Sequence, residues 1–318
     1  MSKTKTIWIL AIALMMLIAC GNTKLLEETR VAVDEYNKEA TSFNEKVKPY
    51  NEAVEQIEAA NKTLQATLDA AQKVINNGEE PYDPETLEQL KSKLVAAGEA
   101  KKATPEEIAE YKSRTVSEES KKDELEVLKS QAEKDIEMIK ETIIPDIPEI
   151  PNYEAVINDV IDAQGVYEDS IMSLKQITAP SDDFVMERLQ RVETITEMGA
   201  VTPDHDPNGQ LNKQGGYIGC IYFTDTQVDR SRLYIEPGKD NVIDIATEGG
   251  GAIEVFATKE EAEVRNNYLG TFDGMGAMSS GSHYVEGTCL IRTSNHLNGT
   301  QQKELTSKIT EALIAVDK

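Results

Sequence analysis

The residues with the clearest chemistry stand near the start of the chain, where an apolar run ends at a cysteine. Residues 7–18 carry no charge and follow two lysines. The run closes with Leu17-Ile18-Ala19-Cys20. A basic head, a short apolar run and a small-residue cleavage site are typical of an export signal. Because the site ends in cysteine, we predict residues 1–19 as a lipoprotein signal peptide and Cys20 as the lipidated residue. The run is shorter than the ~20 residues that an uncleaved membrane-spanning helix needs.

A second candidate for chemistry is the acidic loop at residues 204–209. Asp204, Asp206 and Asn208 alternate before a glycine, as in the opening of a calcium-binding loop. The twelfth position, where a bidentate glutamate is needed, is Gly215. The dipeptide Asn208-Gly209 also forms ordinary turns. The sequence therefore leaves two alternatives open, a structural turn, which it favours, and a Ca²⁺ site.

Two further cysteines, Cys220 and Cys289, lie in strand-like runs. Once Cys20 is lipidated they form an even pair in an oxidising compartment, which predicts a disulfide between them. The alternative is two small buried thiols.

Signals for catalysis are weak in the rest of the chain. The three histidines lack zinc-type spacing, and no G-x-S-x-G motif is present. Glu254 and Arg292 fall on strands at positions expected to face solvent. The net charge of −24 argues against nucleic-acid binding, which requires a basic surface, and it opposes docking on anionic lipid. We therefore expect no cofactor and no enzymatic activity.

The elements that must position these residues fall into two halves. In residues 20–178, apolar residues recur every three or four positions, which predicts a long helix over 24–77, helix starts near Pro84 and Thr104, and helices over 117–143 and 153–177. Asn61 occupies one stripe position, where a buried polar residue can fix the register of a coiled coil. A proline at every third position from 145 to 151 predicts an extended crossover. We expect a long antiparallel helical bundle or coiled-coil stalk, with parallel self-association as the alternative.

Residues 179–318 have a different character, and Thr178–Asp182 is expected to be a linker. The pattern predicts helices over 182–197, 259–272 and 298–316, and strands over 217–223, 232–235, 242–246, 252–257 and 283–293. The fold class is therefore α+β, and this domain is expected to be a two-layer α+β sandwich with a mostly antiparallel sheet.

Three segments of this domain resemble one family. They are Asp206–Asp225, Gly250–Phe256 with Ala262, Arg265 and Tyr268, and His283–Arg292. The family is a set of uncharacterised lipoproteins of Gram-positive bacteria that often pair such a domain with a helical N-terminal half. Some members carry a transferred label of extracellular-matrix binding. The resemblance implies a Gram-positive lipoprotein and adds no chemistry.

Together these observations predict a protein anchored by Cys20 on the extracytoplasmic face of the cell membrane. The C-terminal domain would be displayed on the helical half and would bind a protein or glycan outside the membrane. Two alternatives remain, an envelope enzyme or sensor that binds a small molecule or calcium, and a structural spacer of the envelope.

Overall fold

A computed structural model describes residues 3–275 and 281–317, and it describes side chains from residue 23 onward within those ranges. The predicted lipidation site, the side chain of Cys20, lies outside the described residues. The described chain is α+β, with eight α-helices and one antiparallel five-stranded sheet. The helices are α1 (Lys3–Asn76), α2 (Pro84–Ala100), α3 (Lys122–Glu141), α4 (Glu154–Gln176), α5 (Asp182–Leu189), α6 (Val242–Ile245), α7 (Lys259–Gly270) and α8 (Gly299–Ile314). The strands are β1 (Ile195–Ala200), β2 (Gly219–Asp225), β3 (Gly250–Val255), β4 (Ser282–Glu286) and β5 (Cys289–Thr293), and the short 3₁₀ helices are η1 (Arg230–Arg232) and η2 (Ala246–Gly249).

The chain divides into two compact units, and the first contains Met1–Leu68 and Ala97–Ile157. In this unit the apolar stripe of α1 packs on α3, with residues such as Tyr36 and Phe43 against Ala132 and Ile136. Lys129 pairs with Glu28, and Lys140 pairs with Glu35, so the residue numbers rise together along the two helices. Helix α3 therefore runs parallel to α1, and the expected antiparallel arrangement of these two helices is wrong.

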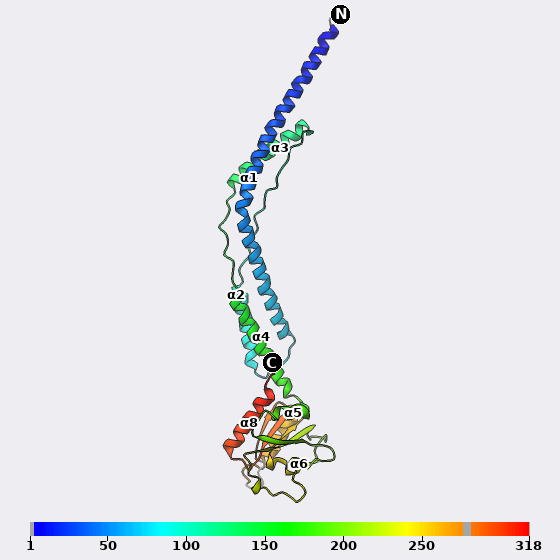
Figure 1. The fold of residues 1–318 in the computed structure, drawn as a ribbon, viewed down its shortest axis with the longest axis vertical. Helices are drawn as coiled ribbons and strands as arrows, with labels where there is room; N and C mark the ends of the chain where they lie inside the picture. The colour runs from blue at the N-terminus through cyan, green and yellow to red at the C-terminus, as the bar shows by residue number, and fades with distance from the viewer. Residues whose placement is uncertain (1–2, 276–280, 318) are drawn as a thin grey trace. The chain divides into compact units, whose positions relative to one another are not determined.

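The helix expected to start near Thr104 is also wrong, because residues 102–117 form an extended segment along α1 (Figure 1). We call this segment the strap. Three asparagines of α1, seven residues apart, each bind the backbone N–H and C=O of one strap residue at 2.8–3.0 Å. The pairs are Asn37 with Arg114, Asn44 with Tyr111, and Asn51 with Ile108. These six hydrogen bonds satisfy the backbone groups of three strap residues, groups that a helix would have paired internally.

The spacing of this asparagine ladder has a simple geometric cause. Seven residues of α-helix rise by about 10.5 Å, and three residues of an extended polyproline-like chain rise by about 9.3 Å. One heptad of α1 therefore matches three strap residues. The same period appears in the burial of the strap, where Pro105, Ile108, Tyr111 and Arg114 are half-buried and the residues between them are exposed.

A second extended segment, residues 142–153, connects α3 to α4, as the repeated prolines predict. At its end the buried Tyr153 donates its hydroxyl to Oδ1 of Asn61 at 2.8 Å and accepts the N–H of Lys102 at 2.8 Å. The Nδ2 of Asn61 donates to the carbonyl of Lys102 at 3.0 Å. Asn61 therefore fastens two extended segments to α1, and its expected contact with another helix in a coiled coil is not formed.

The second unit contains Asp69–Ala96 and Asn158–Lys318. Within it α2 and α4 pack antiparallel, since Tyr82 bonds to Ser170 at one end and Lys93 pairs with Asp159 at the other. The carbonyl of Ile177 accepts the N–H of Thr288 at 2.8 Å, and the Ile177 side chain is fully buried in the core beside the sheet. The expected linker at Thr178–Asp182 is thus fixed to the sheet, and the boundary predicted at residue 179 does not separate the units.

The sheet has the order β1-β2-β3-β5-β4. One face packs on α5 and α8 through Ile221 and Ile253, and the other face packs on α6 and α7 through Tyr222 and Leu290. Every residue of β2 and β3 is buried. We call β1–β5 with α5–α8 the sheet domain. It has helices on both faces, so the expected two-layer sandwich is wrong and three layers take its place (Figure 1).

Several predicted elements of this domain change type. The run 283–293 is a hairpin, β4–β5, that turns at Gly287, where φ is 59°. Residues 242–245 form α6 because the side chain of Asn241 accepts the amide hydrogens of Ile243 and Asp244, a typical N-cap. Residues 233–235 are not a strand, and the helix expected to reach 197 ends at Leu189. Within the described part of the chain, we find no helix with the length and apolarity needed to cross a membrane.

Candidate functional site

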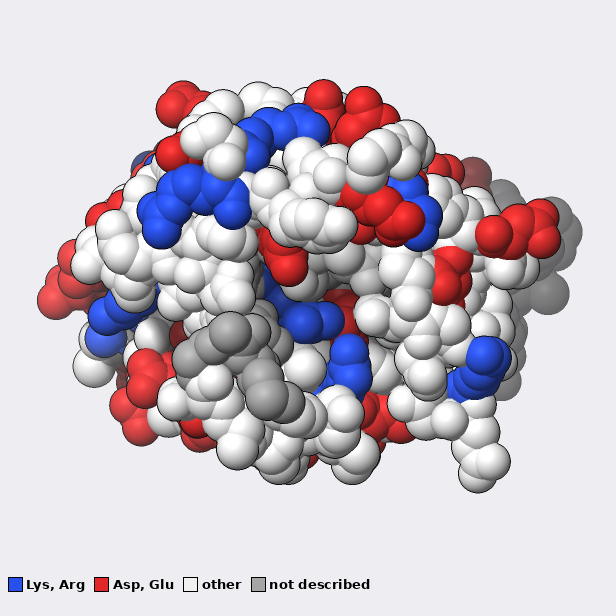
Figure 2. Space-filling view, turned by 90° about the horizontal axis from the view of Figure 1, so that it is seen from below, with Lys and Arg blue, Asp and Glu red and all other residues white. Residues whose placement is uncertain are grey.

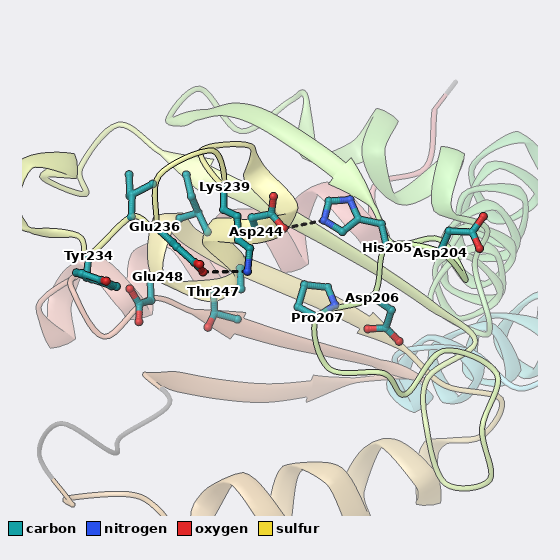
Figure 3. A pocket seen from close by; sticks show the side chains of 13 residues that line it. Asp204, His205, Asp206, Pro207, Tyr234, Glu236, Lys239, Asp244, Thr247 and Glu248 are labelled. Carbon is teal, nitrogen blue, oxygen red and sulfur yellow. Dashed lines mark hydrogen bonds and ion pairs between the residues drawn. The ribbon is translucent and has the colours of Figure 1, made fainter.

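A polar pocket of the sheet domain lies beside α6. It has a volume of about 610 Å³, and Figure 3 shows the side chains that line it. Three segments form the walls: residues 204–207, residues 234–239, and residues 244–248 around the end of α6. A bridge between Thr202 and His205 holds the first segment. The pocket is therefore assembled from loops that the sheet and α6 position.

A hydrogen-bonded His–Asp pair and a Lys–Glu ion pair occupy its walls. Nε2 of His205 lies 2.7 Å from Oδ1 of Asp244, and Nζ of Lys239 lies 2.9 Å from Oε2 of Glu236 (Figure 3). The hydrogen bond from His205 is the largest of the effects that lower the pKa of Asp244. Sequence reasoning missed Asp244 because it placed the residue on a strand. The asparagine before Val242-Ile243-Asp244 was the available signal, since it is a preferred N-cap residue.

Ala246, at the end of α6, has a left-handed φ of 55° with ψ of −140° and lines the same pocket. This backbone region is costly for residues with a side chain, by roughly 1–3 kcal/mol. Ala246 therefore keeps a costly backbone conformation at the wall of the pocket.

The predicted calcium ligands do not converge. Oδ1 of Asp206 accepts the Tyr217 hydroxyl at 2.5 Å and the amide of Asn208 at 3.1 Å, and Oδ2 accepts the amide of Leu211 at 2.8 Å. Asp204 is exposed, and its carboxylate points away from that of Asp206 (Figure 3). The Nδ2 of Asn208 donates to the Tyr222 hydroxyl at 2.8 Å. The geometry supports a structural turn, and the described residues contain no group of three His, Cys, Asp or Glu side chains placed to hold a metal.

The hydrogen bonds of Asp206 also set its charge state. Burial alone would raise the pKa of Asp206, but the bonds from Tyr217 and from backbone amides outweigh burial and lower it. Burial and the bond to Asp206 raise the pKa of Tyr217. The carboxylate therefore stays charged and organises the loop.

A buried ion-pair cluster lies on the same face of the sheet, beneath α7. Glu254 is fully buried, with Oε1 at 2.7 Å from Nη1 of Arg292 and Oε2 at 3.0 Å from Nε of Arg265. The expectation that Glu254 and Arg292 face solvent is wrong, because α7 covers this face of the sheet. Two guanidinium groups on one carboxylate compensate its buried charge.

The predicted disulfide is contradicted by the structure. Cys220 and Cys289 are both free thiols. Cys220 lies in the core against α7, whereas Cys289 lies in the core against α5 and α8, so they occupy opposite faces of the sheet. Burial raises the pKa of both thiols, that of Cys289 to about 12. The alternative that the sequence left open, two buried thiols, is therefore correct.

Charge is not concentrated on one part of the face that Figure 2 shows. Acidic and basic side chains are interspersed there among uncharged ones.

Comparisons with known protein families, with curated proteins and with solved structures give no match. The resemblance of residues 182–318 to Gram-positive lipoproteins therefore stays a prediction.

Proposed function

We propose that the protein is a lipid-anchored, non-enzymatic protein of the extracytoplasmic face of the membrane. In this proposal Cys20 holds the lipid and the helical residues form a stalk. The sheet domain binds a protein or glycan partner through the pocket beside α6. The apolar run that ends at Cys20 supports the location.

The observation that carries the proposal is the bracing of α1. Between Thr23 and Leu68 this helix has 46 residues, which correspond to about 70 Å. The asparagine ladder and Asn61 bind extended chain between residues 37 and 61, about half of that length. A helix reinforced in this way resists bending and holds its ends at a fixed separation, and both properties suit a stalk.

The pocket beside α6 supports binding over catalysis. Its described lining contains one histidine, His205, which pairs with Asp244, and no serine or cysteine that this pair could activate. It does offer acidic and basic side chains beside apolar ones such as Ile235, and an exposed aromatic ring, Tyr234, at 87% exposure. Exposed tyrosines are common at recognition sites because they bury a large area at a low cost in side-chain entropy.

The test is site-specific photo-crosslinking of the full chain in the cells that make it. A photoreactive amino acid replaces Tyr234, and in a matched control it replaces Tyr268, an exposed tyrosine of α7 outside the pocket. We expect one discrete adduct from position 234, and none of that mass from position 268.

Adducts that are equal at both positions, or absent at both, would contradict a binding role for this pocket. In that case the spacer and small-ligand alternatives would gain support.

A further inference from the structure

A groove separate from the pocket beside α6 runs between the edge strand β4 and helix α8. It has a volume of about 460 Å³. Helix α8 presents one polar face to it, with residues three or four apart. Its lining includes Lys303 and Thr310 from α8, Tyr284 and Glu286 from β4, and Tyr82. His283 of β4 also lines it, with its Nδ1 bonded to Asn266 at 2.7 Å.

The groove contains two buried oxygen atoms without a hydrogen-bond partner. Oε2 of Glu286 is one, on a side chain that is only 7% exposed, and Oγ1 of Thr310 is the other. An unsatisfied buried polar atom costs roughly 1–3 kcal/mol, and more when it is charged. The groove therefore contains two buried oxygen atoms to which a ligand could donate hydrogen bonds.

The lysines described near this groove do not supply such a donor. Among the described residues, Lys303 lines the groove but makes no ion pair with Glu286, and Lys259 pairs with Glu263. Burial raises the pKa of Glu286, and the hydroxyls of Tyr284 and Tyr82 together with the charge of Lys259 offset only part of that rise. A positive ligand would complete this environment.

We infer that the groove between β4 and α8 binds a primary ammonium group on an alkyl chain. The carboxylate of Glu286 would be its counter-ion and the Thr310 hydroxyl a second acceptor. The inference does not depend on lipid anchoring or on the pocket beside α6.

The tyrosines add selectivity for this class of ligand. Tyr284 is 48% exposed and Tyr82 is partly buried, so both rings are accessible at the groove. An aromatic face attracts a cation and also packs against an alkyl stem. A free alkylamine and the side chain of a lysine in a partner protein present this same chemistry.

The experiment measures binding to the full chain by calorimetry, with n-butylammonium as the first probe. A second probe is the blocked peptide acetyl-Gly-Lys-Gly-amide, and a third is the same peptide with the lysine Nε-acetylated. We expect butylammonium to bind and the acetyllysine peptide not to bind, because acetylation removes the charge. A lysine peptide that binds more tightly than butylammonium assigns the source to a protein, and weaker binding assigns it to a free amine.

Glu286→Gln should weaken binding at least about tenfold, since a hydrogen bond to a charged group is lost. Glu304→Gln, at an exposed glutamate of α8 outside the groove, is the matched control and should leave binding unchanged. Thr310→Val is a second test that keeps the shape of the side chain and should weaken binding less. No binding of either ammonium probe, or equal binding by Glu286→Gln with an unchanged melting temperature, would overturn the inference.

Discussion

At the scale of single residues, Asp206 shows how one carboxylate can organise a loop. It accepts a tyrosine hydroxyl and two backbone amides, whereas Asp204, two residues earlier, is exposed. Sequence spacing treats these two aspartates as equivalent ligands. Their surroundings make one of them a structural residue.

We predict that Asp206→Asn lowers the free energy of unfolding by about 1–3 kcal/mol, because the amide cannot accept all three donors. The hydrogen bonds hold the pKa of Asp206 below that of an unfolded aspartate, about 3.9. The carboxylate therefore contributes its full stability above about pH 4 and loses it as the pH falls through the folded pKa. Denaturant unfolding at several pH values measures this: the difference between wild type and Asp206→Asn should be constant from pH 5 to 8 and shrink below pH 4.

Asp204→Asn is the matched control for this prediction and should change stability by less than about 0.5 kcal/mol. Equal effects of the two substitutions would contradict the structural role given to Asp206. A rise in melting temperature with millimolar Ca²⁺ that Asp204→Asn removes would instead restore the metal site.

The residue scale also marks the limit of sequence reasoning about the site. The turn at Asn208-Gly209 and the buried thiols were among the open alternatives, because local spacing and composition carry those signals. The pair His205–Asp244 joins residues 39 positions apart, and the pairing of Glu254 with Arg292 requires β3 beside β5. No local pattern contains the strand order that brings such residues together.

At the scale of elements, the strap shows how tertiary contacts override local propensity. Thr104-Pro105-Glu106-Glu107 carries the signals of a helix start, and the long helix, α7 and α8 were predicted from the same kinds of signal. The strap lacks a helix because the asparagine ladder takes its backbone groups. Asparagines at a spacing of seven on a helix, and the larger side chains of Ile108 and Tyr111 three residues apart in the following segment, were the signals that could have revealed it.

We predict that Asn44→Ala lowers the free energy of unfolding by about 1–3 kcal/mol, because two hydrogen bonds to Tyr111 are lost. Amide hydrogen exchange gives the sharper measurement, since the Tyr111 N–H loses its only acceptor in the ladder. Its exchange should accelerate more than that of Ile108, which Asn51 still holds.

Gln56→Ala removes an exposed amide from the same helix and serves as the control. It should leave the exchange of all three ladder amides unchanged. If Asn44→Ala left Tyr111 as protected as in the wild type, the ladder would not be what holds the strap.

At the scale of the whole molecule, charge decides how the protein can associate with a membrane. With a net charge of −24, the chain is repelled by anionic lipid. Under the proposed lipid anchoring, acyl chains on Cys20 supply the membrane affinity, at about 0.8 kcal/mol for each buried methylene group.

We predict that the wild-type chain, expressed in a Gram-positive host, incorporates labelled fatty acid and sediments with membranes, and that Cys20→Ser does neither. A high-salt wash should not release the wild type, because hydrophobic insertion is not screened by ions, whereas an electrostatic association would be.

Cys220→Ala controls for the loss of any thiol. That side chain is fully buried against α7, so its replacement should leave both label and sedimentation unchanged. Label retained by Cys20→Ser, or wild type found unlabelled in the soluble fraction, would remove the lipid anchor and with it the reason for a stalk, so this measurement tests the location and the proposed role of α1 together.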